Sequence, residues 1–223
     1  MNIWQKTIVA GCMVLTAAPA LALDRGDMLV RFGPTWVMPN DSSGEVTPPG
    51  VEGVSVDNGS ALGVSFTYMA TPNVGIEVLA ATPFKHDIKS SGDLAGVVPG
   101  KIGDTYHLPP TVSLQYHFTD LGAMRPYLGA GINYTNFFKS RTRGGLRDAG
   151  YDGLSLSDSW GWSLQAGVDV DVNERWFVGA SLYYMSIDTT AKVRGEGGPF
   201  GDELRVNVDI DPWVLMVGAG LRF

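Results

Sequence analysis

The sequence has little of three things that many protein functions require, namely cysteine, histidine and an excess of positive charge. Cys12 is the single cysteine in 223 residues, and the three histidines are His86, His107 and His117. Sixteen basic side chains stand against 23 acidic ones, so the formal net charge is −7 at pH 7. This composition excludes zinc sites built from several thiolates and disfavours binding to the phosphate backbone of nucleic acids. We expect no nucleic-acid partner.

The sequence also lacks an unbroken run of 18 or more apolar residues, which a helix needs to cross a bilayer. A helical membrane protein is therefore excluded, whereas one built from strands is not. With 44% hydrophobic and 10% aromatic residues, the chain is too apolar for a disordered protein. Its length indicates one compact domain.

Residues 1–22 have the parts of a secretory signal peptide. A short segment with one basic residue, Lys6, precedes an apolar stretch, and small residues then lead to an A-x-A sequence that ends at Ala22. This order is typical of a leader that is removed after export, and we expect cleavage after Ala22. Cys12 lies within the leader, so residues 23–223 contain no cysteine nucleophile.

Beyond the leader, apolar and polar residues alternate with a period of two. The clearest segment is 111–118, in which every second residue is Val, Leu, Tyr or Phe and the residues between them are polar. Successive side chains of a strand point to opposite faces, so this period predicts strands with one apolar face. Eight strands are predicted, at 28–37, 62–68, 74–82, 111–118, 127–137, 162–170, 177–187 and 215–223.

The connections between these strands alternate in length. Short turns are predicted at 71–73, 120–125 and 172–174, and long polar loops at 38–59, 83–109, 138–158 and 189–203. An even strand number, tight turns at one end, long loops at the other and aromatic residues near the strand ends are typical of a transmembrane β-barrel. We therefore predict an all-β fold, an eight-stranded antiparallel transmembrane β-barrel, for residues 23–223. A soluble β-sandwich is the alternative, because its strands have the same period.

Eight strands enclose a lumen that is wide enough for side chains or one small ligand. If the first strand starts on the periplasmic side, alternation predicts which side chains point inward and at what height. In the periplasmic half, the polar inward set is Arg31, Glu77, Gln115, His117, Asp169 and Arg222. A buried charge is costly unless it is paired, so we expect these side chains to pair with one another. They would form a polar plug that closes the periplasmic end.

Above this floor the inward set becomes apolar and comprises Val37, Leu79, Phe137, Tyr183, Met185, Ile187 and Val214. The pattern predicts an apolar tunnel over a polar floor. Leu79 and Tyr183 fall at similar heights just above the charged layer, which makes them the candidates for the narrowest point. Ordinary core filling, which any small barrel needs, is the alternative interpretation of the same residues.

Several segments at barrel spacing resemble the OmpW family of small outer-membrane proteins. They are VDNG (56–59), FTYMAT (66–71), GIEVLAATPFKH (75–86), LPPTVSLQYHF (108–118), RPYLGAGINYT (125–135), DSWG (158–161) and DPWVLMVGAGLRF (211–223). The resemblance implies an outer-membrane channel of a Gram-negative bacterium that takes up small hydrophobic molecules passively and releases them sideways into the membrane. It also implies a constriction on the third and seventh strands, which maps onto Leu79 and Tyr183, where the family's tryptophan is replaced by Tyr183.

A sideways exit requires an interruption of the barrel wall, and proline interrupts a ladder because it has no N–H to donate. Pro83 follows the third predicted strand, and Pro109 and Pro110 precede the fourth. We predict the lateral opening at these three prolines. Pro34 and Pro212, on the first strand and just before the eighth, mark a second candidate.

The expected partners are a small hydrophobic ligand, outer-membrane lipids and the barrel assembly machinery, because the last strand ends on Phe223 as in outer-membrane barrels. No catalytic residue, metal site or cofactor is predicted. Two alternatives remain open. A structural or adhesive barrel would display its loops without transport, and its lumen would be fully packed above the constriction. A lipid-modifying enzyme would need a base and a nucleophile, such as His86 or His107 with Ser90 or Ser91.

Overall fold

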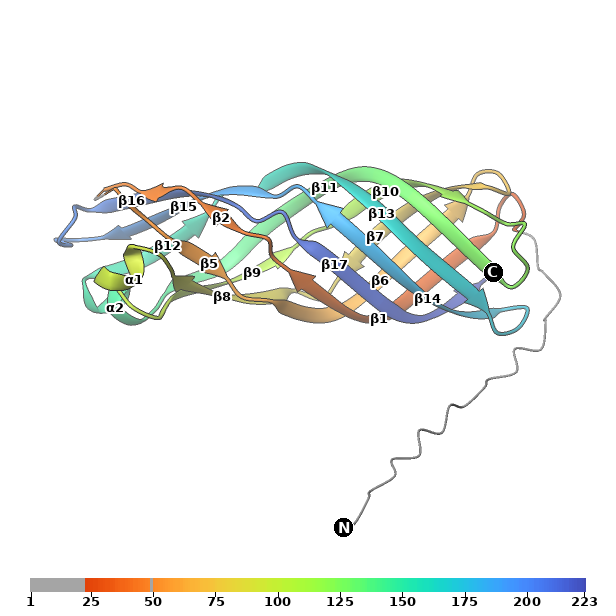
Figure 1. The fold of residues 1–223 in the computed structure, drawn as a ribbon, viewed down its shortest axis with the longest axis horizontal. Coiled ribbons are helices and arrows are strands. Elements are labelled where there is room, and N and C mark those ends of the chain that lie inside the picture. The colour runs from red at the N-terminus through yellow and green to blue at the C-terminus, as the bar shows by residue number, and fades with distance from the viewer. Residues whose placement is uncertain (1–22, 49) are drawn as a thin grey trace, which may run out of the picture.

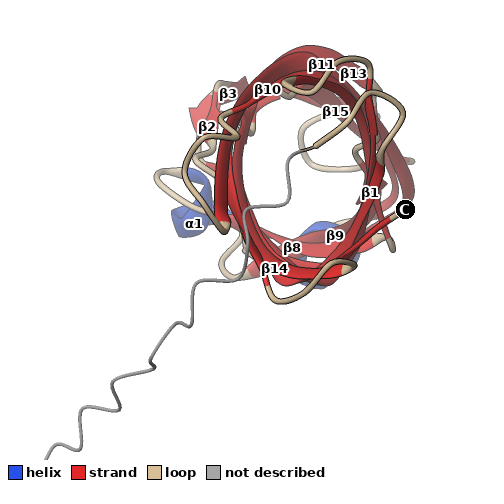
Figure 2. Ribbon diagram, turned by 90° about the vertical axis from the view of Figure 1, so that its right-hand side faces the viewer, coloured by secondary structure: helices blue, strands red, loops and turns tan. Residues whose placement is uncertain are grey.

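The computed structural model describes residues 23–48 and 50–223 (Figure 1), so the predicted leader lies outside the described residues. Eight strands form the barrel: β1 (Met28–Met38), β6 (Gly59–Met69), β7 (Val74–Ala81), β10 (Thr111–His117), β11 (Met124–Thr142), β13 (Ser159–Asp171), β14 (Trp176–Met185) and β17 (Trp213–Arg222). Each pairs antiparallel with the next, and β17 pairs with β1 to close the ring seen end-on in Figure 2. The predicted eight-stranded antiparallel barrel is confirmed.

The period of two in the sequence becomes an alternation between lumen and exterior. Along β10 the Thr, Ser, Gln and His side chains are buried, whereas the Val, Leu and Tyr side chains between them are exposed. Large exposed apolar side chains surround the barrel as a belt, which includes Phe32, Phe66, Leu114, Leu128, Leu164, Val178 and Val217. A closed barrel pairs its backbone groups internally, so an apolar outer belt suits contact with lipid.

No helix in the described part of the chain is long and apolar enough to cross a membrane.

Three tight connections lie at one end of the barrel, as predicted, and the carboxyl end of the chain lies there too (Figure 1). Between β6 and β7, the amide of Val74 donates to Thr71 Oγ1 at 2.9 Å. Between β13 and β14, the amides of Arg175 and Trp176 donate to Asn173 Oδ1. Short side chains with an oxygen acceptor satisfy amides that a tight turn leaves unpaired, which explains these residue types.

The long connections are not irregular loops, and that prediction was wrong. They contain β2 (Ser42–Ser43), β3 (Glu45–Val46), β4 (Val51–Glu52), β5 (Val54–Val56), β8 (Phe84–Ser90), β9 (Lys101–Leu108), β12 (Tyr151–Leu156), β15 (Asp188–Gly195) and β16 (Glu203–Asp209), with the short helices α1 (Leu94–Val97) and α2 (Gly144–Asp148). In β16, Leu204, Val206 and Val208 point inward, but the outward residues are charged or polar. The outer face of these strands is polar, so the segments resembled loops in composition.

Most of these strands form two sheets that continue the wall beyond the apolar belt, and β3 pairs with β4 in a separate two-stranded sheet. One sheet consists of β5, β8, β9 and the last part of β11, and the other of β12, β15, β16 and β2. We call this part the head; in Figure 1 it lies at the end opposite the carboxyl terminus. A single cluster of buried apolar side chains extends from Leu79 and Tyr183 in the barrel to Ile102, Val193 and Leu204 in the head. The head is therefore a continuation of the barrel, and the two share one apolar interior.

Candidate functional site

Arg31 is the centre of a charged network inside the barrel, near the end with the tight turns. Its Nε and Nη2 atoms donate to the two carboxylate oxygens of Asp169 at 3.1 and 2.7 Å, and its Nη1 lies 3.6 Å from Glu77 Oε2. All three residues are at most 3% exposed. Two-point contact with a carboxylate gives a guanidinium a fixed geometry, and pairing offsets much of the cost of burying the charges.

Neutral side chains connect this network to the rest of the floor. Arg31 Nη1 donates to Thr67 Oγ1 at 2.8 Å, and Thr67 Oγ1 donates to Gln115 Oε1 at 3.3 Å. His117 Nε2 lies 3.0 Å from the same oxygen of Gln115, and the His117 ring stacks on Tyr127. The Arg31 guanidinium lies 4.9 Å from the centre of the Tyr127 ring. Five of the six predicted plug residues thus join one network, together with Thr67 and Tyr127, which were not predicted.

Arg222, the sixth predicted plug residue, lies nearer the rim of the barrel. Its Nη2 atom forms an ion pair with Asp27 at 2.7 Å, and both side chains are 17% exposed. Arg125 was not predicted, yet it is 1% exposed, pairs with Asp171 and lies over the ring of Phe177. It was missed because the strand was predicted to begin two residues after it, which assigned it to a turn.

The seven predicted tunnel residues are all buried above this floor, each at most 8% exposed, and all belong to the one apolar cluster. They are Val37, Leu79, Phe137, Tyr183, Met185, Ile187 and Val214. Tyr183 marks the boundary with the floor, because its hydroxyl donates to Glu77 Oε1 at 3.2 Å. Leu79 follows Glu77 by two residues on the same face of β7. The proposed constriction thus lies directly above the charged layer, and its part in transport stays a prediction.

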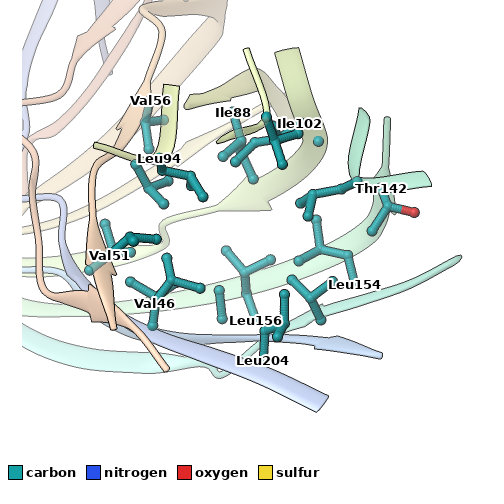
Figure 3. A pocket seen from close by; sticks show the side chains of 18 of the residues that line it. Val46, Val51, Val56, Ile88, Leu94, Ile102, Thr142, Leu154, Leu156 and Leu204 are labelled. Carbon is teal, nitrogen blue, oxygen red and sulfur yellow. The ribbon is translucent and has the colours of Figure 1, made fainter. Parts of the chain in front are cut away.

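An apolar cavity lies in the head (Figure 3). Its volume is about 60 Å³. Its lining consists almost entirely of aliphatic side chains from the strands and short helices of the head, among them Val46, Ile88, Ile102, Leu154 and Leu204. None of the seven predicted tunnel residues lines it. This cavity was missed because its walls come from segments that were predicted to be loops.

A smaller cavity of about 20 Å³ lies next to it, on the side that faces the barrel. The two cavities share Val56, Ile88, Leu156 and Ile210, and the smaller one is also lined by His86, Thr105, His107 and Phe137. The rings of His86 and His107 stack, with centroids 4.8 Å apart and planes 15° from parallel. Ser90, considered above as a nucleophile, donates its hydroxyl proton to the carbonyl of Gly100.

The ladder between the third and fourth strands of the wall is interrupted at the predicted prolines. β7 pairs with β10 only as far as Leu79, and pairing resumes between β8 and β9 at Phe84. Between these positions, Pro83 lies on one side and Pro109 and Pro110 on the other, and the ladder has no residue pair there. By contrast, β11 keeps one register with both β10 and β9 across the same level. The interruption is therefore confined to one side of the fourth strand.

A buried polar cluster meets this interruption from inside the barrel. Asn133 Nδ2 donates to Thr111 Oγ1 at 2.9 Å and lies 3.3 and 3.4 Å from the carbonyl oxygens of Pro109 and Pro110. Thr135 Oγ1 donates to Asn133 Oδ1 at 2.7 Å. Asn133, Thr111 and Thr135 are fully buried, and none was predicted. At the second candidate, the pairs on either side of Pro34 keep one register between β1 and β17.

The OmpW family profile matches residues 24–223. The chain belongs to the OmpW family. Outer membrane protein W of Vibrio cholerae is 42% identical over 222 residues, which cover 98% of this chain and 100% of that protein. The crystal structure of the outer membrane protein OprG from Pseudomonas aeruginosa superimposes with a TM-score of 0.83 at 37% identity and covers 91% of this chain and 98% of that chain. The Dibenzothiophene metabolism operon protein PahQ of Pseudomonas aeruginosa is 32% identical over 181 residues, 81% of this chain and 79% of that protein.

This OmpW-family barrel is accordingly located in the outer membrane of a Gram-negative bacterium. Outer-membrane barrels keep their short turns on the periplasmic side and their long connections outside. The charged floor around Arg31 is therefore periplasmic, and the head with its apolar cavity is extracellular.

Proposed function

We propose that this OmpW-family barrel is a channel for the passive uptake of small hydrophobic molecules, which enter through the head and leave sideways at the proline interruption. The aliphatic cavity of the head is the observation that carries the proposal. Burial of apolar surface is worth roughly 25 cal/mol per Å². An aliphatic cavity at the extracellular end would therefore favour apolar molecules over polar ones.

The charged floor makes a straight passage into the periplasm unfavourable for such a molecule. It would have to separate the Arg31–Asp169 pair and break the hydrogen bond between Tyr183 and Glu77. A buried charge that loses its partner is costly, since removal of one partner of such a pair destabilises proteins by about 3–5 kcal/mol. The interruption at Pro83, Pro109 and Pro110 lies just above this floor, on the side of the barrel, so release into the bilayer is the route with the smaller electrostatic cost.

The name of a relative supports the same class of cargo. PahQ is named for an operon of dibenzothiophene metabolism. Dibenzothiophene is a flat aromatic molecule without a charged group. The family resemblance and the apolar lining of the head thus favour the same kind of ligand.

The proposal is tested by placing hydroxyl groups inside the head. Val193 and Val206 line the larger cavity, and Val→Thr keeps the side-chain shape while adding a hydroxyl. We expect V193T with V206T to lower naphthalene uptake by cells several-fold. The control is K192T with R205T, on the same two strands but facing outward.

Uptake must be compared with that of cells without the barrel, and both variants must be shown to reach the outer membrane. Equal uptake by the two variants would remove the head cavity from the route. Equal uptake with and without the wild-type barrel would overturn the channel proposal and favour a barrel that only displays its head.

A further inference from the structure

The histidine pair of the smaller cavity is buried in a largely apolar part of the lumen. His86 on β8 is 2% exposed and His107 on β9 is 5% exposed. The His107 ring also stacks on Phe84, at 5.4 Å between centroids, and lies 5.7 Å from Phe137. An aliphatic or aromatic residue would fill this space without a polar atom. The two imidazoles therefore call for a chemical explanation beyond packing.

Both imidazoles are neutral at pH 7. Burial lowers the pKa of His107 to about 3, and the neighbouring His86 contributes to this shift. Burial also lowers the pKa of His86, although the carbonyl of Asp57 partly opposes it. His86 Nδ1 lies 2.6 Å from this carbonyl oxygen, which can only accept, so Nδ1 carries the proton. His86 Nε2 therefore presents a lone pair and accepts hydrogen bonds.

The Nε2 atoms of His86 and His107 are both buried and have no hydrogen-bond partner within the described residues. A buried polar atom without a partner costs free energy, and such atoms in folded proteins usually have a partner that completes them. Here the side chains line a cavity that adjoins the larger apolar cavity. A molecule whose apolar body lies in the head can therefore bring a polar group to the pair.

We propose that His86 and His107 form a recognition point for a single hydroxyl group on an otherwise apolar molecule, such as a phenol or a fatty alcohol. His86 Nε2 accepts the hydroxyl proton, and His107 Nε2, protonated in the matching tautomer, donates to the hydroxyl oxygen. The ring centroids lie 4.8 Å apart, and both rings line the same small cavity. Val56, Ile88 and Ile210 line the cavity beside the pair, and none of the described residues that line it offers a charged side chain to a carboxylate or an amine.

This inference rests on the proposed function, because it names the class of cargo that the same route selects. It gives the channel a preference for hydroxylated apolar molecules over hydrocarbons of the same size. A water molecule at the pair is the competing explanation, and it predicts no difference between two such probes.

The test compares 1-naphthol with naphthalene, which differ by one hydroxyl group. In H107F the phenyl ring keeps the stack with Phe84 and His86 but has no nitrogen. We expect the ratio of 1-naphthol to naphthalene uptake to fall about five-fold, which corresponds to one hydrogen bond of about 1 kcal/mol. F137L alters the wall of the same cavity without removing a nitrogen, so it should change both rates by a similar factor. An unchanged ratio in H107F would overturn the inference.

A second measurement does not depend on transport. In barrels labelled with ¹⁵N-histidine and placed in lipid nanodiscs, 1-naphthol should shift the Nε2 resonances of His86 and His107, whereas naphthalene should not. His117, in the periplasmic floor, is the internal reference and should stay unchanged. If neither probe is taken up by wild-type cells but 1-naphthol shifts these resonances, the channel proposal fails and the recognition point stands. Resonances that do not respond to 1-naphthol would refute the recognition point itself.

Discussion

Single residues of the floor show how a small lumen accommodates charge. The guanidinium of Arg31 has a partner for each of its nitrogen atoms in Asp169, Thr67 or Glu77, and the Tyr127 ring covers it. Such a network is sensitive to the loss of one member, because the remaining charge stays buried without compensation. The stability of the floor therefore depends on each of these side chains.

Replacing the carboxylate of Asp169 tests this dependence. We expect D169N to lower the free energy of unfolding by about 3 kcal/mol, because Arg31 loses the nearer of its two buried carboxylate partners and keeps only Glu77 at 3.6 Å. Urea unfolding from lipid vesicles, followed by tryptophan fluorescence, measures the change. D152N removes a carboxylate from an exposed position of the head and should leave the midpoint unchanged. Equal midpoints for the two variants would contradict the role given to the Arg31–Asp169 pair.

Inward glycines make room for the rings that cover the floor. A Cβ atom at position 167 would lie 2.3 Å from Cζ of Tyr127, whose hydroxyl is hydrogen-bonded to Ser181. We expect G167A to displace this ring and to destabilise the barrel by about 1–3 kcal/mol, as overpacking does in other cores. Gly96 has open space around its Cβ position, so G96A is the matched control. Similar unfolding midpoints for G167A and G96A would show that the ring moves at little cost.

At the scale of strands, the solvent that surrounds the outer face, lipid or water, determined which strands could be predicted from the sequence. Within the belt, strands have lipid on one side and polar floor residues on the other, so the contrast between their faces is strong. In the head the outer face meets water and the inner face is aliphatic, but turns and glycines divide the segments into short strands. The inward Leu204, Val206 and Val208 retain the period of two, and a search for it in shorter windows would have found β16.

The polar cluster of Asn133, Thr111 and Thr135 could not be predicted for a different reason. Alternation places these residues inside, but it does not say that the carbonyl oxygens of Pro109 and Pro110 need partners there. That need arises from the interrupted ladder, which depends on pairing between distant segments. By contrast, the prolines that interrupt the ladder were visible in the sequence, because a missing N–H is a property of the residue itself.

Restoring the missing donors tests the lateral exit. In P83A with P110A the backbone regains two N–H groups at the interruption, which allows the third and fourth strands to approach each other. We expect naphthalene uptake to fall several-fold, while the amount of barrel in the membrane stays the same. P126A is the control, because Pro126 faces Val168 within the continuous ladder between β11 and β13. Unchanged uptake in the double variant would place the exit elsewhere, with the Pro34 seam as the next candidate.

The molecule as a whole combines an aliphatic extracellular head with a charged periplasmic floor, and Leu79 and Tyr183 lie where the two meet. On the proposed route, a hydrophobic molecule that enters the head approaches this level before it leaves through the wall. Positive charge at the junction would oppose that approach, because an apolar molecule cannot compensate a buried guanidinium. The junction is thus the place where one change should affect transport most.

We expect L79R with Y183R to reduce the uptake of apolar compounds to the level of cells that lack the barrel. The matched control is D120R with E174R, which adds two arginines in exposed periplasmic turns away from the route. Heat-dependent gel mobility of outer-membrane fractions shows whether each barrel is folded and inserted. Uptake by a folded junction variant at the wild-type rate would mean that the cargo does not pass this level. The lumen above Leu79 would then be a packed core, and the head would have to act by binding at the cell surface.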